Sequence, residues 1–207
     1  SNTNAGTATA VITFCGNYTG YYDAIKDTYY NNYQKTFQIV PRDIADENII
    51  IEPIDDQEYN KNPQEPELTI TYGAMTLVKG VDYTVDYSEN HTDSGIVTVT
   101  VTGINNFKNT RTTTYQITPK SLDSADIQVA AIENQEYTGS NVVPDVTVTY
   151  GTTVLKQGVD YQCEPGTNTV KPGTATVIIK GIGNYGGQIT KDFKIIGNLE
   201  LNGRIET

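Results

Sequence analysis

The stretch Val97-Thr-Val-Thr-Val101 places an apolar residue at every second position, with threonine in between. The stretch Leu68-Thr-Ile-Thr-Tyr72 has the same alternation. A period of two is typical of a β-strand that buries one face and exposes the other. Turn signals that contain glycine, such as Gly73, Gly80 and Gly95, recur every eight to twelve residues and separate short strands. The sequence therefore predicts an all-β protein.

The strand pattern repeats along the chain with a period of 78 residues. Ile54–Tyr59 aligns with Ile132–Tyr137, and Gly80–Tyr83 aligns with Gly158–Tyr161. Between residues 46–117 and 124–195, 24 of the 72 ungapped positions are identical. An internal repeat of this length indicates two copies of one structural unit.

The N-terminal part of the sequence matches only the back half of this repeat. Gly6–Val11 is similar to Gly173–Ile178, and Phe37–Ile39 is similar to Phe193–Ile195. Eighteen residues separate Tyr18 from Phe37, whereas seven residues fill the same interval in the other copies. We interpret residues 1–44 as the back half of a first repeat with a Tyr-rich insertion, and we expect its front half upstream.

About seven short strands in a period of this length predict tandem immunoglobulin-like antiparallel β-sandwiches. We assign residues 1–44 to the incomplete first repeat, 45–120 to the second, 121–197 to the third and 198–207 to a tail. Short junctions at Pro41 and Pro119 favour an extended, semi-rigid rod. Because half a sandwich exposes strand edges, residues 1–44 are predicted either to be completed by another chain or to pack on the second repeat. The alternating stretch Leu199–Leu201 is a candidate donated strand.

Charge and composition restrict the partners and the chemistry. The chain has 14 Lys and Arg against 25 Asp and Glu, a net charge of −11, which disfavours nucleic acid and anionic membrane surfaces as partners. It has no apolar stretch of the roughly 20 residues that span a bilayer, so no membrane insertion is predicted. With one His and two Cys, it offers little for an enzyme active site, and no catalytic, cofactor-binding or metal-binding residue is predicted. We expect Cys15 and Cys163 to be free, buried thiols.

Two clusters of chemistry-bearing residues have a competing structural interpretation. A calcium site could use the carboxylates of one repeat, but their spacing matches no calcium-binding loop, and two of them change in the next copy. These residues are Asp55, Asp56, Glu58, Asp82 and Asp86, with Asn134 and Glu164 as the changed counterparts. We favour solvated side chains, with Asp82 and Asp160 as turn residues. A lysine–asparagine isopeptide crosslink is disfavoured because the front segments 48–53 and 126–131 contain no lysine.

The candidate ligand-binding residues are tyrosines of the insertion. The segment 18–33 contains six of the fifteen tyrosines of the chain: Tyr18, Tyr21, Tyr22, Tyr29, Tyr30 and Tyr33. Exposed tyrosines on a loop can stack on sugar rings or contact a protein partner. The alternative is a long hairpin, with one helical turn around residues 23–27, whose tyrosines pack on the protein itself. For the repeated pairs Tyr59/Tyr137, Tyr72/Tyr150 and Tyr83/Tyr161, we favour packing at the core rim with hydrogen bonds to the backbone.

The run of motifs from residue 134 to 195 resembles the immunoglobulin-like repeats of large bacterial cell-surface proteins, the MBG-type group of Gram-positive bacteria. The motifs are Gln135-Glu-Tyr137, Thr147-Val-Thr-Tyr-Gly151, Gly158-Val-Asp-Tyr161, Gly173-Thr-Ala-Thr-Val177 and Gly181-Ile-Gly-Asn-Tyr185. The resemblance covers nearly the whole chain, from Gly6 to Ile195. It implies an extracellular, secreted or wall-associated protein in which non-catalytic modules act as stalk or presentation segments beside neighbouring domains. The alternative function is an adhesive or carbohydrate-binding module that recognises a glycan or a host or cell-surface protein through residues 18–33.

Overall fold

The computed structural model describes residues 3–18 and 20–197. Within these residues the regular structure consists of β-strands and contains no helix, which confirms the all-β prediction. The chain divides into two compact units: Ser1–Ile54, Pro66–Ser88 and Thr98–Thr114 form the first, and Asp55–Glu65, Glu89–Val97 and Tyr115–Thr207 form the second. This division does not follow the 78-residue period, so the repeat boundaries remain predictions. The proposed donated strand, Leu199–Leu201, lies outside the described residues.

The strands of the first unit are β1 (Gly6–Thr13), β2 (Tyr21–Asp23), β3 (Thr28–Tyr30), β4 (Asn32–Ile39), β5 (Arg42–Asp43), β6 (Ile49–Ile51), β8 (Ile70–Tyr72), β9 (Met75–Thr76), β10 (Tyr83–Tyr87) and β12 (Phe107–Lys108). Strands β11 (Gly95–Gly103) and β13 (Thr110–Thr118) have residues in both units. The second unit contains β7 (Gln57–Glu58), β14 (Lys120–Ser121), β15 (Ile127–Val129), β16 (Gln135–Glu136), β17 (Val148–Tyr150), β18 (Thr153–Val154), β19 (Tyr161–Pro165), β20 (Gly173–Gly181), β21 (Tyr185–Gly186) and β22 (Gln188–Ile196).

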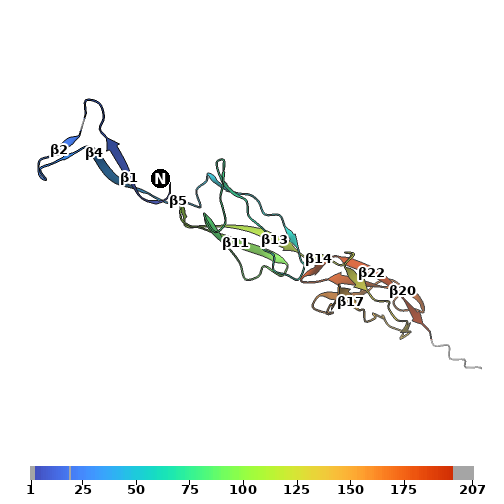
Figure 1. Cartoon of the computed structure of the whole chain (residues 1–207). Helices are drawn as coiled ribbons and strands as arrows, with labels where there is room; N and C mark the ends of the chain where they lie inside the picture. The colour runs from blue at the N-terminus through green and yellow to red at the C-terminus, as the bar shows by residue number, and fades with distance from the viewer. Residues whose placement is uncertain (1–2, 19, 198–207) are drawn as a thin grey trace, which may run out of the picture. The chain divides into compact units, whose positions relative to one another are not determined.

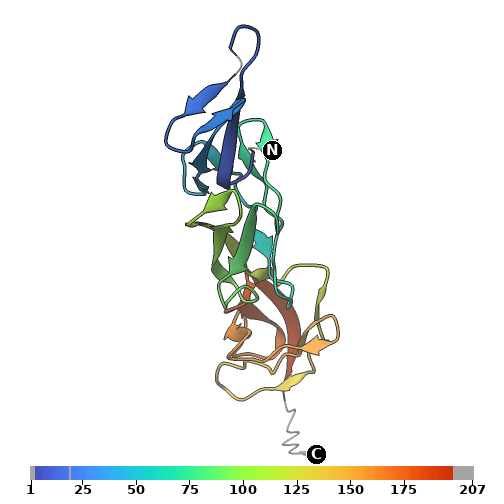
Figure 2. The same ribbon diagram turned by 60° about the vertical axis from the view of Figure 1, so that its left-hand side comes forward.

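The sequence repeat is also a repeat of strand order. A four-stranded sheet has the order β10-β11-β13-β7, and its counterpart one period later has the order β19-β20-β22-β16. The three-stranded sheets β6-β8-β9 and β15-β17-β18 correspond in the same way. Strands β17, β20 and β22 of the second unit are labelled in Figure 1, and Figure 2 shows the same strands from another side.

One hydrophobic core joins the four-stranded and the three-stranded sheet of the second unit. Val177, Ile179 and Phe193 point inward from the four-stranded sheet, and Ile127 and Val148 point inward from the three-stranded sheet. All five are buried, and alternate residues along β20 are less buried, as the period of two requires. This arrangement is compatible with a β-sandwich. In the first unit, Ile49, Ile70, Tyr83, Val101 and Phe107 form a separate buried cluster.

The long strand pairs β1–β4, β10–β11 and β20–β22 are antiparallel, as expected, whereas several short strands pair parallel. β7 pairs parallel with β13, and β16 pairs parallel with β22. The reason is a change of sheet within the front segment of each repeat: β15 pairs antiparallel with β17, and the chain then continues to β16 in the other sheet. Strand β16 joins that sheet at its edge, beside β22, and the two strands run in the same direction. Their pairing is therefore parallel.

The N-terminal hairpin pairs in the register of the repeat. Gly6 lies opposite Ile39 in the β1–β4 pair, and Gly173 lies opposite Ile195 in the β20–β22 pair. The insertion forms a second hairpin, β2–β3 (Figure 1). Residues 24–27 form a turn, so the expected helical turn is wrong. The Asp23 carboxylate accepts hydrogen bonds from the backbone N–H groups of Ile25 and Lys26, which favours a tight turn over a helix.

The two cysteines have different environments. Both are free thiols, but Cys15 is exposed in the turn region after β1, so the expectation of burial is wrong for this residue. Cys163 is half-buried on β19, and burial raises the pKa of its thiol. The difference arises because Cys163 packs against the core of the second unit, whereas Cys15 follows the end of a strand.

We expect a thiol-reactive probe at neutral pH to modify Cys15 at least about tenfold faster than Cys163, because thiolate formation and access both favour an exposed cysteine. The measurement is the rate of modification followed by mass spectrometry. Cys15→Ser should leave only the slow reaction, and Cys163→Ser only the fast one. Equal rates for the two single-cysteine variants would contradict the structure.

Candidate functional site

The six candidate tyrosines do not form one cluster. Tyr21 and Tyr30 stack across the β2–β3 hairpin with ring centroids 5.3 Å apart, and Tyr33 packs edge-on against Tyr21 at 5.8 Å. Tyr22 and Tyr29 are opposite one another in the adjacent register position, so they lie on the other face of the hairpin. The remaining candidate, Tyr18, is exposed outside both strands.

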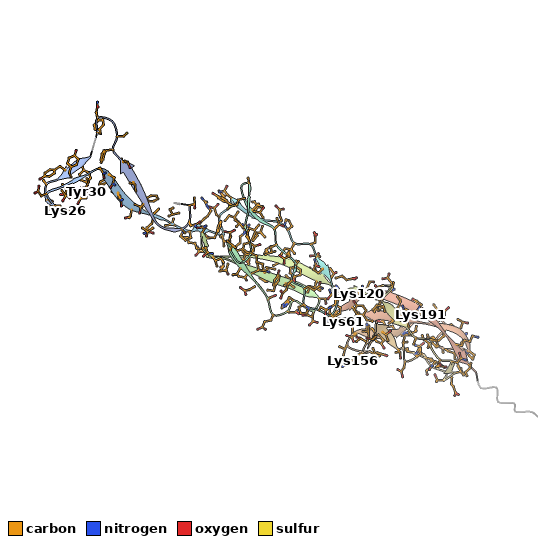
Figure 3. The ribbon with its side chains drawn as sticks, viewed as in Figure 1. Lys26, Tyr30, Lys61, Lys120, Lys156 and Lys191 are labelled. Atoms are coloured by element: carbon orange, nitrogen blue, oxygen red, sulfur yellow. The ribbon has the colours of Figure 1, made fainter. Side chains whose placement is uncertain are left out.

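Polar side chains surround the Tyr21–Tyr30 stack. Lys26, Asn32 and Gln34 line a cavity of about 370 Å³ together with these two rings. Figure 3 labels Lys26 and Tyr30 on this hairpin. Gly20 permits the close approach of the preceding loop, because a Cβ atom at this position would lie 2.1 Å from the Tyr30 carbonyl oxygen. An aromatic ring can contact the apolar face of a sugar ring, and neighbouring amide and ammonium groups can form hydrogen bonds with its hydroxyls.

A second cluster, which we call the Lys120 seam, lies within the second unit. Lys120 is 7 % exposed, and its Nζ lies 2.7 Å from Glu58 Oε2 and 3.3 Å from Asp126 Oδ2. These carboxylates, led by the hydrogen bond to Glu58, raise the pKa of Lys120. The ammonium also lies 5.7 Å from the centre of the Tyr150 ring. Figure 3 labels Lys120 and Lys61, both of which contact this tyrosine.

Aromatic rings and an amide complete the Lys120 seam. Tyr59 packs edge-on against Tyr185 with centroids 5.6 Å apart. Asn184 accepts a hydrogen bond from the Ser94 backbone N–H at 2.7 Å and donates one from Nδ2 to Asp93 Oδ1 at 2.8 Å. The seam therefore connects the segments 58–61, 93–94, 120–126 and 184–185 of the second unit.

The first unit contains the same pattern one period earlier. Asn106 accepts a hydrogen bond from the Ala5 backbone N–H at 2.7 Å and donates one from Nδ2 to Asn4 Oδ1 at 3.2 Å. Arg42 replaces Lys120, and its Cζ lies 4.5 Å from the centre of the Tyr72 ring. Arg42 also pairs with Asp46 at 2.6 Å. We call this cluster the Arg42 seam.

The structure corrects part of the tyrosine prediction. Tyr83 and Tyr161 are buried and donate hydrogen bonds to the carbonyls of Leu68 and Val146, as expected for the core rim. Tyr59 packs against the core of the second unit, also as expected, and in addition belongs to the Lys120 seam. Its counterpart Tyr137 is 49 % exposed, so the pair does not share one role. The position of a residue in the repeat therefore predicts its strand, but long-range contacts determine which residues surround it.

Sequence reasoning missed Lys120, Arg42 and the two asparagines. The available signals were a basic residue directly after proline at both junctions and the identity of Asn106 and Asn184 between copies. These signals do not reveal burial, because a lysine next to proline is usually solvated.

Three of the five carboxylates of the calcium hypothesis, Asp56, Glu58 and Asp82, have other roles. Asp56 accepts a hydrogen bond from the Gln116 backbone N–H at 2.9 Å, and Glu58 pairs with Lys120. Asp82 and Asp160 accept hydrogen bonds from the N–H groups of Val78 and Lys156, which agrees with their expected role in turns. Among residues 3–18 and 20–197, no group of three or more His, Cys, Asp or Glu side chains is arranged to hold a metal ion. The same residues contain no helix with the length and apolarity to cross a membrane.

A scan against protein-family models finds no match for this chain, and a search of the curated proteins finds no significant match. The resemblance to bacterial surface repeats therefore stays a prediction from the motifs.

We predict that the protein loses stability above about pH 10. Burial raises the pKa values of Tyr59 and Tyr185, and Glu58 raises that of Lys120. The unfolded chain then releases these protons at lower pH than the folded chain, so the free energy of unfolding falls as pH rises. Below this range the contribution of these groups is constant.

The measurement is urea unfolding at several pH values between about 8 and 11.5. Tyr185→Phe removes one ionisable group and should reduce the alkaline slope, whereas Tyr18→Phe, at an exposed position, should leave it unchanged. A free energy of unfolding that stays constant to the highest pH would contradict the prediction.

Proposed function

We propose that the chain is a non-catalytic segment of tandem immunoglobulin-like repeats that serves as a stalk or presentation module in an extracellular bacterial surface protein. The observation that carries the proposal is the use of one seam pattern twice: an asparagine, a cation and a tyrosine at equivalent repeat positions. The natural partners of such a segment are neighbouring domains of a longer chain.

The chemistry of the seams supports a role in holding consecutive repeats. At the Lys120 seam, hydrogen bonds, ion pairs and aromatic contacts connect residues from before and after Pro119, the predicted junction. Such contacts resist rotation about a junction, whereas a flexible linker would need none of them. A semi-rigid junction keeps a terminal domain at a fixed distance, which is what a spacer requires.

We predict that the chain scatters X-rays in solution as an extended particle with little flexibility. Combined Tyr59→Ala and Asn184→Ala substitutions should increase flexibility, because they remove the aromatic contact with Tyr185 and the amide bridge to Ser94. The matched control is Tyr137→Ala, which changes the exposed tyrosine at the equivalent repeat position. A compact particle, or equal flexibility in all three proteins, would refute the spacer proposal.

A second candidate function is adhesion through the Tyr-rich hairpin. The Tyr21–Tyr30 stack, bordered by Lys26, Asn32 and Gln34 around an open cavity, supports a glycan or a polar protein loop as ligand. Each tyrosine provides a large contact area at low entropic cost. The candidate residues of this function are those five, while Tyr22 and Tyr29 occupy the other face.

The test is binding of the full chain to an array of soluble glycans. Tyr30→Ala should reduce the affinity for any specific glycan at least about tenfold, because it removes one aromatic ring that contacts the ligand. Tyr22→Ala is the matched control on the opposite face and should retain binding. Equal losses in both variants, or no specific signal, would remove the adhesion candidate and leave the spacer proposal standing.

A further inference from the structure

We propose that the Arg42 seam is the acceptor site for a Gln-Glu-Tyr strand of another repeat of this kind, with glutamate bound by Arg42 and tyrosine packed on Tyr72 and Phe107. The inference rests on the proposed repeat architecture and adds to it a specific site and a specific occupant. The occupant is a polypeptide segment with the chemistry of Gln57–Lys61.

The Lys120 seam shows how such a segment binds. Gln57 and Glu58 pair parallel with the end of β13, opposite Ile117 and Thr118. The backbone N–H of the next residue, Tyr59, donates to the Thr118 carbonyl at 2.9 Å. This pairing directs the Glu58 carboxylate to Lys120 and the Tyr59 ring to Tyr185. Lys61 then donates from Nζ to the Tyr150 carbonyl and to Thr153 Oγ1.

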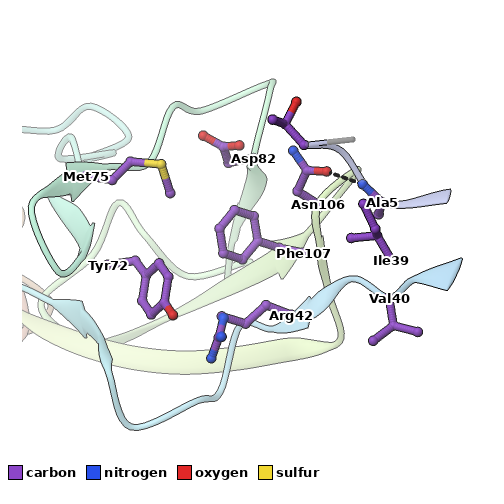
Figure 4. A pocket seen from close by; sticks show the side chains of 10 residues that line it. Ala5, Ile39, Val40, Arg42, Tyr72, Met75, Asp82, Asn106 and Phe107 are labelled. Carbon is purple, nitrogen blue, oxygen red and sulfur yellow. Dashed lines mark hydrogen bonds between the residues drawn. The ribbon is translucent and has the colours of Figure 1, made fainter. Parts of the chain in front are cut away.

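The Arg42 seam presents the counterparts of these acceptor groups around a cavity of about 290 Å³. Figure 4 shows the lining side chains converging on this space. The repeat alignment relates Arg42, Tyr72, Met75, Asp82, Asn106 and Phe107 to Lys120, Tyr150, Thr153, Asp160, Asn184 and Tyr185. The cavity therefore has the position that Tyr59 and Lys61 have in the Lys120 seam.

Part of the occupied arrangement is already present in the first unit. Ala5 and Asn4 bind Asn106 as Ser94 and Asp93 bind Asn184. The Asn106 amide is thus satisfied. The cavity of the Arg42 seam therefore corresponds to the position of the Gln57–Lys61 segment alone. This correspondence identifies a segment of that kind as the expected occupant.

The edge of β4 provides the strand-pairing groups. Within the described residues, β4 has a hydrogen-bonded partner strand on one side, β1, whereas β13 and β22 each lie between two strands. Phe37 on β4 is 46 % exposed, but its repeat counterparts Tyr115 and Phe193 are 3 % and 4 % exposed. An added strand would pair beside Ile39 and Val40, which line the cavity.

Charge favours the glutamate. The Arg42 side chain is 42 % exposed, while the Lys120 side chain, with Glu58 bound, is 9 % exposed. Arg42 forms an ion pair with Asp46, and Lys120 forms one with Asp126, although these aspartates are not at equivalent repeat positions. The second carboxylate of the Lys120 seam comes from the Gln-Glu-Tyr segment. A guanidinium has donors enough to bind a second carboxylate while it retains the first.

The test uses the full chain, labelled with ¹⁵N, and a synthetic peptide with the sequence of residues 52–65. We expect chemical-shift changes at Arg42, Tyr72, Asn106 and along residues 37–40 on titration. A peptide with Glu58→Ala and Tyr59→Ala substitutions should bind at least about tenfold more weakly, because it lacks the charged hydrogen bond and the aromatic anchor.

Variants of the chain identify the acceptor residues. Arg42→Gln should weaken binding about tenfold, and Arg42→Lys should restore it. Lys191→Gln, at an exposed position on β22 of the second unit, is the control and should have no effect. Met75→Thr recreates the Thr153 hydroxyl and should tighten binding through Lys61. Absence of shift changes, changes confined to other residues, or equal binding by both peptides would overturn the proposal. Because the scattering experiment concerns the Lys120 seam, its outcome is independent of this titration.

Discussion

The ammonium group of Lys120 is nearly buried, and a charge in that position requires partners. The partners are the carboxylates of Glu58, which precedes Lys120 in the sequence, and of Asp126, which follows it. Glu58 reaches Lys120 only if residues 57–59 run beside the end of β13, and this parallel pairing also sets the position of Tyr59. The ion pairs, the strand switch and the aromatic contacts of the seam therefore depend on one another.

The two seams place different cations, Lys120 and Arg42, at the same repeat position beside a tyrosine. Lysine presents a compact charge 5.7 Å from the centre of the Tyr150 ring, whereas arginine presents a planar group that lies over Tyr72 and pairs with Asp46 at the same time. In both seams an asparagine side chain binds one backbone N–H and one side-chain oxygen. An asparagine suits this position because a single amide group can accept and donate together.

The Tyr-rich hairpin differs from the rest of the chain in the use of its tyrosines. In the repeats, tyrosines such as Tyr83 and Tyr161 are buried and hydrogen-bonded to the backbone. On the hairpin, Tyr21, Tyr22 and Tyr29 are exposed, and the order comes from stacking across two short strands. The absence of a side chain at Gly20 lets its backbone lie beside the Tyr30 carbonyl and the Tyr29 ring.

The sequence by itself determined the all-β class, the strand that contains Val97–Val101, the 78-residue period and the role of Asp82 and Asp160, because alternation and turn chemistry are local properties. It also placed the N-terminal segment in the register of the later copies. Only the tertiary structure decided the parallel pairing of β7 with β13, the burial of Lys120, the separate roles of Tyr59 and Tyr137, and the exposure of Cys15. These features depend on which segments meet across many intervening residues, and the same local pattern is compatible with either outcome.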